Sequence, residues 1–69
     1  MSNLYTIRTD KGITQAKLAE LSGINARQIR KIETGEIKTR NITIGTITAL
    51  ANALGVGIEE LIKDNAEKH

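Results

Sequence analysis

The sequence contains no cysteine and no proline, and Tyr5 is its single aromatic residue. Without cysteine, the chain can form neither a disulfide framework nor a thiolate metal site. With almost no aromatic side chains, the core volume must come from Ile, Leu, Val and Ala. That composition suits a compact helical domain better than a sheet built on aromatic pairs, so we predict an all-α fold.

Long apolar runs and a charged leader are also lacking. The longest apolar stretches are a few residues, which is too short to span a membrane. The first residues do not show the charged and apolar segments of a signal peptide. The 69 residues are enough for one domain, near the lower size that a core alone can hold together. We therefore expect a single domain over residues 1–69, located in the cytoplasm, with no membrane partner.

Groups that carry catalysis are equally sparse. The single histidine, His69, is at the end of the chain and is expected to be a solvated tail residue, and there is no Ser–His or Cys–His arrangement. The acidic residues form no cluster of the metal-binding kind, and Glu59 and Glu60 are expected near the positive end of a short helix. The sequence predicts a protein that is not an enzyme and that holds no metal or cofactor.

What is present is an uneven distribution of charge. The formal net charge of +2 is too small to indicate nucleic-acid binding by itself. Residues 25–40, however, carry five basic and two acidic side chains, whereas residues 58–69 carry two basic and four acidic ones. The middle of the chain is therefore predicted to form a basic surface, and residues 64–69 an acidic tail.

Glycines divide the chain into short helical stretches. A first helix is expected at about residues 2–10 and a second after Thr14, its predicted N-cap, ending near residues 22–23. Asn25 is the predicted N-cap of a third helix, with Gln28 three residues on, as in a capping box. Residues 36–42 favour a loop, with a short extended piece as the alternative.

Two more helices follow this loop. From about residue 43, apolar residues recur at helical spacing up to Leu54, and residues 58–62 form a last short amphipathic stretch. The chain is thus predicted to have five helices. Their core is expected to consist of Leu18, Leu21, Ile29, Ile32, Ile47, Leu50 and Leu54.

The third helix has a basic outer face. Ile29 and Ile32 mark its buried face, and at about 100° per residue the opposite side carries Arg27, Lys31 and Thr34, with Arg30 on the flank. The chain thus has two short predicted helices joined by a tight glycine turn, and the second helix is basic. This arrangement is typical of a helix-turn-helix unit, which we predict at about residues 14–34. Such a second helix fits a DNA major groove about 12 Å wide.

The run Gly-Ile-Thr-Gln-Ala-Lys-Leu-Ala-Glu-Leu-Ser-Gly-Ile-Asn at residues 12–25 resembles the phage-repressor/Cro type of helix-turn-helix protein, the Xre family. Ile-Glu-Thr-Gly at residues 32–35 and Leu-Ala-Asn-Ala-Leu-Gly-Val at residues 50–56 match later parts of the same pattern. The resemblance covers roughly residues 4–62. It implies a compact five-helix, lambda-repressor-like domain that binds double-stranded DNA.

The resemblance also implies roles for single residues. Ala26, Arg27 and Lys31 fall at base-reading positions, although Ala26 can only pack against a thymine methyl group. Arg8 and Glu33 match a pair that forms a buried salt bridge. The loop after Gly35 is about three residues longer than is usual for the family. The positions expected to contact phosphates are Gln15, Asn25, Gln28, Arg30, Thr34, Lys38 and Arg40.

Two functions are compatible with these features. The first is a sequence-specific transcriptional regulator, a repressor, that binds a pseudo-palindromic operator as a homodimer, since one reading helix covers only a few base pairs. Val56, Ile58 and the last helix are the expected pairing surface. The alternative is an antitoxin-like or adaptor module that uses the same fold mainly to hold a protein partner.

Overall fold

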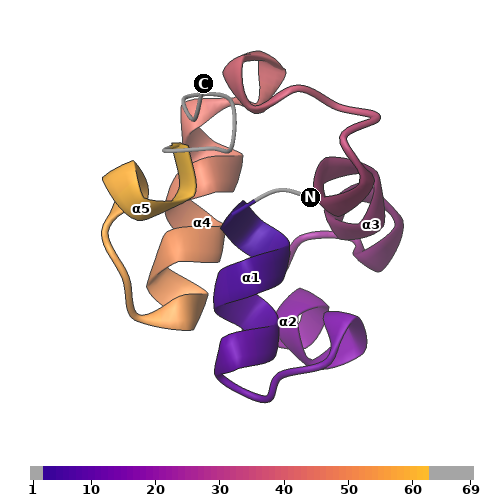
Figure 1. Ribbon diagram of the computed structural model, residues 1–69, viewed down its shortest axis with the longest axis vertical. Helices are drawn as coiled ribbons and strands as arrows, with labels where there is room; N and C mark the ends of the chain where they lie inside the picture. The colour runs from indigo at the N-terminus through magenta and orange to yellow at the C-terminus, as the bar shows by residue number, and fades with distance from the viewer. Residues whose placement is uncertain (1–2, 63–69) are drawn as a thin grey trace.

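Five α-helices make up the part of the chain that the computed structural model describes, residues 3–62 (Figure 1). The predicted acidic tail at residues 64–69 and His69 lie outside these residues. The expected all-α fold with five helices is confirmed. The elements are α1 (Asn3–Asp10), α2 (Gln15–Ser22), α3 (Ala26–Thr34), a short 3-10 turn η1 (Thr39–Asn41), α4 (Ile44–Leu54) and α5 (Ile58–Ile62).

Hydroxyl and amide side chains fix where the helices begin. The Thr14 hydroxyl accepts a hydrogen bond from the Lys17 backbone N–H at 3.0 Å, so Thr14 caps α2 as predicted. The side chain of Asn25 accepts from the Arg27 backbone N–H at 2.7 Å and caps α3. Each cap satisfies an amide that has no partner within its own helix, which contributes about 1 kcal/mol.

A left-handed glycine forms the turn of the helix-turn-helix. Gly23 has φ +77° and ψ +8°, and its backbone N–H donates to the Ala19 carbonyl oxygen at 2.8 Å. This conformation is costly for residues with a Cβ atom but not for glycine, so α2 ends here and the chain can turn into α3.

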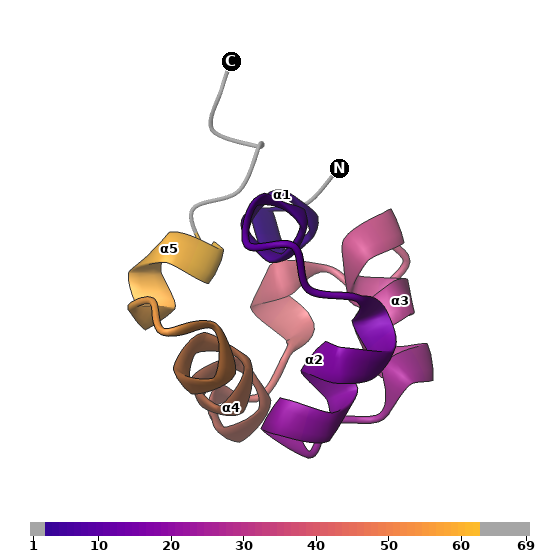
Figure 2. The same ribbon diagram turned by 90° about the horizontal axis from the view of Figure 1, so that it is seen from below.

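The core lies between the helices and is built from aliphatic side chains. Seen from below (Figure 2), the helices surround this core, with α1 between α5 and α3, and α2 between α3 and α4. Leu18, Ile29 and Leu50, one from each of α2, α3 and α4, are fully buried. Burying each such side chain stabilises the fold by roughly 1.5–3 kcal/mol. The remaining buried apolar residues are Leu4, Ile32, Ile47, Ala51, Leu54 and Leu61.

Leu21 was expected in the core, and that prediction is wrong, because its exposed fraction is 50%. The side of α2 that faces the core carries Gln15, Leu18, Ala19 and Ser22, which recur at the i, i+3, i+4, i+7 spacing of one helical face. Leu21 lies roughly a third of a turn away from the middle of that face. Its side chain therefore remains half in solvent.

The segment between α3 and α4 is a loop, not a strand. Its only regular part is η1, closed by the Asn41 backbone N–H donating to the Lys38 carbonyl oxygen at 2.9 Å. Ile37 and Ile42 pack against the core on either side of η1 and anchor the loop at both ends. Among the described helices, none combines the length and the apolar character that crossing a membrane requires.

Candidate nucleic-acid interface

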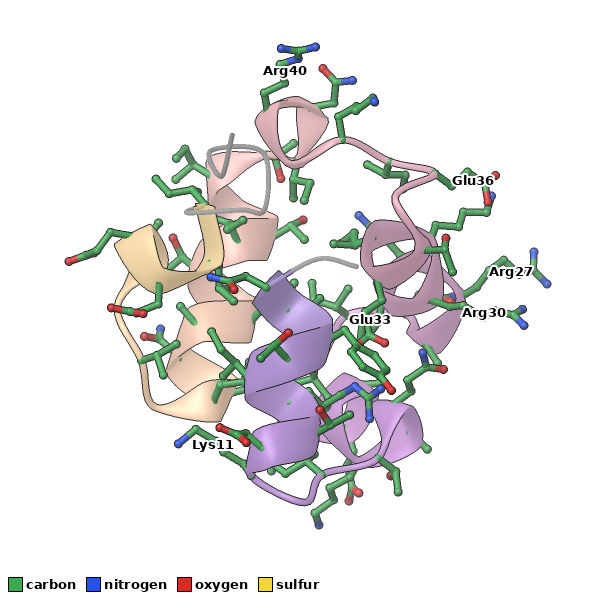
Figure 3. All side chains as sticks on the ribbon, in the orientation of Figure 1. Lys11, Arg27, Arg30, Glu33, Glu36 and Arg40 are labelled. Atoms are coloured by element: carbon green, nitrogen blue, oxygen red, sulfur yellow. The ribbon has the colours of Figure 1, made fainter. Side chains whose placement is uncertain are left out.

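The outer face of α3 is exposed and basic. Ala26, Arg27, Arg30 and Thr34 are exposed, whereas Ile29 and Ile32 on the opposite side are buried. Figure 3 shows the side chains of Arg27 and Arg30 pointing away from the body of the molecule in the same direction. The helix therefore presents two guanidinium groups without a carboxylate between them on this face.

Lys31 is less exposed than its place on the helix predicts. After Gly35 the chain folds back on α3, and the Ile37 backbone N–H donates to the Lys31 carbonyl oxygen at 3.1 Å. This contact brings the loop against the end of the helix, and Lys31 is half-buried. Arg30, which was expected only at the flank, has the more open position of the two.

The N-terminal end of α3 carries two amide side chains. Asn25 is exposed, and its side-chain oxygen accepts the capping hydrogen bond of α3, so its amide nitrogen remains as the hydrogen-bond donor of this side chain. Gln28, one turn along, is half-buried. Ala26 lies between them and is exposed, but it offers only a methyl group.

The loop between α3 and α4 carries two further cations. Lys38 and Arg40 are exposed. In Figure 3, Arg40 projects from the top of the view, apart from Arg27 and Arg30 on the side of α3. The basic surface is thus extended along the molecule and not concentrated at one point. In residues 3–62, no acidic or histidine side chains gather in a group able to hold a metal ion.

Behind α3, Arg8 and Glu33 form a buried ion pair. Arg8 Nε lies 2.6 Å from Glu33 Oε2, and Arg8 Nη2 lies 3.0 Å from Glu33 Oε1. The two residues are 8% and 4% exposed. The hydrogen bonds from Arg8 to Glu33 raise the pKa of Arg8 above its usual value, against the effect of burial. Arg8 Nη1 also donates to the Ile13 carbonyl oxygen at 2.6 Å, so this pair ties α1, the turn before α2, and α3 together.

Gln15 joins this ion pair, which sequence reasoning did not foresee. Its side-chain Nε2 lies 2.9 Å from Glu33 Oε1, so it donates to the same oxygen that Arg8 Nη2 contacts. Gln15 is the first residue of α2 and is half-buried. Nothing in the sequence pattern links residues 15 and 33, because the contact depends on how α2 and α3 cross.

Comparisons with known proteins agree with this geometry. A family model described as Helix-turn-helix matches residues 4–61. The chain is 36% identical over 66 residues to an uncharacterized HTH-type transcriptional regulator, y4dJ, of Sinorhizobium fredii. The aligned segment covers 96% of this chain and 82% of that protein. It is 33% identical over 60 residues to the control protein C.SmaI of Serratia marcescens, covering 87% of this chain and 68% of that protein. No solved structure gives a significant match.

Proposed function

This chain belongs to the helix-turn-helix family of DNA-binding regulators, and we propose that it binds a specific operator sequence by inserting α3 into the major groove. In this role Arg27 reads base edges near the N-terminal end of α3, with Ala26 and Lys31 beside it. A guanidinium group matches the O6 and N7 acceptors of guanine with two donors.

The observation that carries the proposal is the contrast between the two sides of α3. The buried side holds Ile29 and Ile32 against the core, and the outer side points Arg27 and Arg30 into solvent (Figure 3). Because the buried side fixes the rotation of the helix, the guanidinium groups are held outward before any DNA is bound. The groups proposed to contact phosphates are Gln15, Asn25, Gln28, Arg30, Thr34, Lys38 and Arg40.

We further propose that the protein acts as a homodimer in the cytoplasm and represses transcription by occupying its operator. A two-fold dimer places two reading helices in successive major grooves about 34 Å apart. Val56 and Ile58 are half-buried and pack on the core of their own chain, whereas Ile62 at the end of α5 is 52% exposed. The outer side of α5, centred on Ile62, is therefore the part of the expected pairing surface that is free to meet a second copy.

The proposal is tested by selecting bound sequences from random duplex DNA and then measuring binding of Arg27→Ala. The variant should lose about 1–3 kcal/mol of binding free energy on the selected duplex. Its affinity should also become insensitive to the identity of one base pair, the one that Arg27 reads. Lys11→Ala is the matched control, because Lys11 is exposed at the end of α1, away from the outer face of α3 (Figure 3). An equal loss of affinity by Arg27→Ala on selected and random duplexes would refute base reading by Arg27.

A further inference from the structure

A single carboxylate oxygen joins the buried ion pair to the surface that would meet DNA. Glu33 Oε1 lies 3.0 Å from Arg8 Nη2 and 2.9 Å from Gln15 Nε2. Glu33 is 4% exposed, whereas Gln15 is half-buried at the start of α2. Gln15 therefore has one end in contact with the interior and another part open to solvent.

The chemistry of the two side chains fixes how the Gln15 amide is turned. An ionised carboxylate only accepts hydrogen bonds, so the amide must point its nitrogen, and not its oxygen, at Glu33. The NH2 group carries two hydrogens, and Glu33 takes one of them. The second hydrogen remains as a donor whose direction is set by the first bond, since the amide group is planar.

We infer that Glu33 is a positioning residue for DNA binding, which acts by holding the Gln15 amide with one N–H ready to donate to a backbone phosphate. This inference rests on the proposed function. An amide free to rotate would also turn its oxygen outward, and an oxygen is repelled by a phosphate. Glu33 excludes that orientation of the amide. The entropy cost of fixing the Gln15 side chain is therefore met when the protein folds, and it does not reduce the affinity for DNA.

Arg8 makes such an arrangement compatible with a polyanion. A lone carboxylate close to a phosphate would oppose binding, but Arg8 contacts both oxygens of Glu33 and cancels its charge. The start of α2 adds to this effect, because the N-terminal end of a helix carries partial positive charge and favours anions. Glu33 can therefore organise the phosphate contact without repelling the phosphate.

Glu33→Gln separates this positioning role from general electrostatics. The substitution removes one negative charge, so long-range attraction to DNA alone would tighten binding. If Glu33 positions Gln15, binding should weaken by about 10-fold, the scale of one hydrogen bond to a charged group. The matched control is Glu36→Gln, which makes the same charge change at an exposed side chain on the same side of the molecule (Figure 3) and should bind as tightly as the parent or more so.

A double-mutant cycle on the selected duplex and on a random duplex tests the inference. Gln15→Ala should lose about as much affinity as Glu33→Gln, and the double variant no more than either one. The loss should be equal on both duplexes. In Gln15→Ala the slope of log K against log salt should stay unchanged, because Gln15 is neutral and releases no counterion. If the affinity losses of Gln15→Ala and Glu33→Gln add in the double variant, the two residues act independently. Glu33 then acts through the placement of α3, and the inference is overturned.

The unaltered protein provides a test that does not depend on a variant folding. In a nitrogen–proton correlation NMR spectrum, one of the two Gln15 side-chain N–H protons should be shifted downfield by Glu33 in the absence of DNA. The second should shift only when duplex DNA is added. If both Gln15 N–H protons of the free protein have the shifts of a solvent-exposed glutamine, or if the first shift is lost on binding, the inference is overturned. If the parent protein binds neither duplex, the proposed function fails and the inference falls with it.

Discussion

The cations on this protein differ in what surrounds them, and this sets what each is expected to do. Arg8 is buried and its charge is matched by Glu33, so it orients helices and is not available to DNA. Removing either partner would leave a buried charge unpaired, which is costly even where the intact pair adds little stability. Arg27 and Lys38 are exposed, but one projects from a fixed helix and the other lies in a loop.

That difference predicts a distinct outcome for Lys38. Lys38→Ala should weaken binding to all duplexes alike and lower the slope of log K against log salt by about 0.9, the amount expected for one phosphate contact. Lys38→Arg should keep the slope, since it keeps the charge. The measurement is a titration of selected and random duplexes at several salt concentrations. An unchanged slope in Lys38→Ala would exclude a phosphate contact by Lys38.

At the scale of the element, the beginning of α3 combines stability with the proposed contact to DNA. Asn25 caps the helix through its side-chain oxygen, and its exposed side chain keeps the amide nitrogen as a hydrogen-bond donor. The cap also fixes where Ala26 and Arg27 start in the helix. One side chain therefore affects both the folding free energy and the placement of the first position proposed to read a base.

Asn25→Ala should lower the free energy of unfolding by about 1 kcal/mol, because the Arg27 N–H loses its acceptor. Asn25→Ser should keep most of the stability, since serine is also a good N-cap, but it lacks the amide donor. Urea denaturation without DNA measures the change in the free energy of unfolding. Duplex binding by Asn25→Ser measures the loss of the amide donor, which should weaken the affinity. Equal stability of the alanine variant and the parent would contradict the capping role.

At the scale of the whole molecule, one small core holds five short helices. A chain of this length buries a limited fraction of its surface and is marginally stable alone. The outer side of α5 leaves Ile62 half in solvent, and Ile44 at the first position of α4 is 72% exposed. Pairing of two copies would cover apolar surface that one copy leaves open, and would double the contacts to DNA.

Ile62→Glu should convert the proposed dimer to a monomer, because two carboxylates would meet at the pairing surface. The helical fold should persist, since Ile62 is already 52% exposed. Sedimentation velocity measures the change, and affinity for a full operator should fall while contact with a single half-site remains. The control is Leu21→Glu, at an apolar side chain that is 50% exposed on α2. A parent protein that sediments as a monomer even on its operator would rule out the dimer.

Local signals in the sequence predicted the elements. Thr14 and Asn25 are helix caps by residue type and position, and Gly23 and Gly35 end helices with positive φ, because these interactions involve residues close together in the chain. Helical spacing likewise predicted that Ile29 and Ile32 face inward, which leaves Arg27 facing out.

Tertiary structure decided the features that depend on how helices cross. The exposure of Leu21 follows from the face of α2 that meets the core, and the half-burial of Lys31 accompanies a loop that folds back on α3. The sequence alone determined that a helix with a basic outer face follows the glycine turn, and which residues lie on it. Only the fold brought Gln15 against Glu33, because that contact joins residues 18 positions apart and no local pattern encodes it.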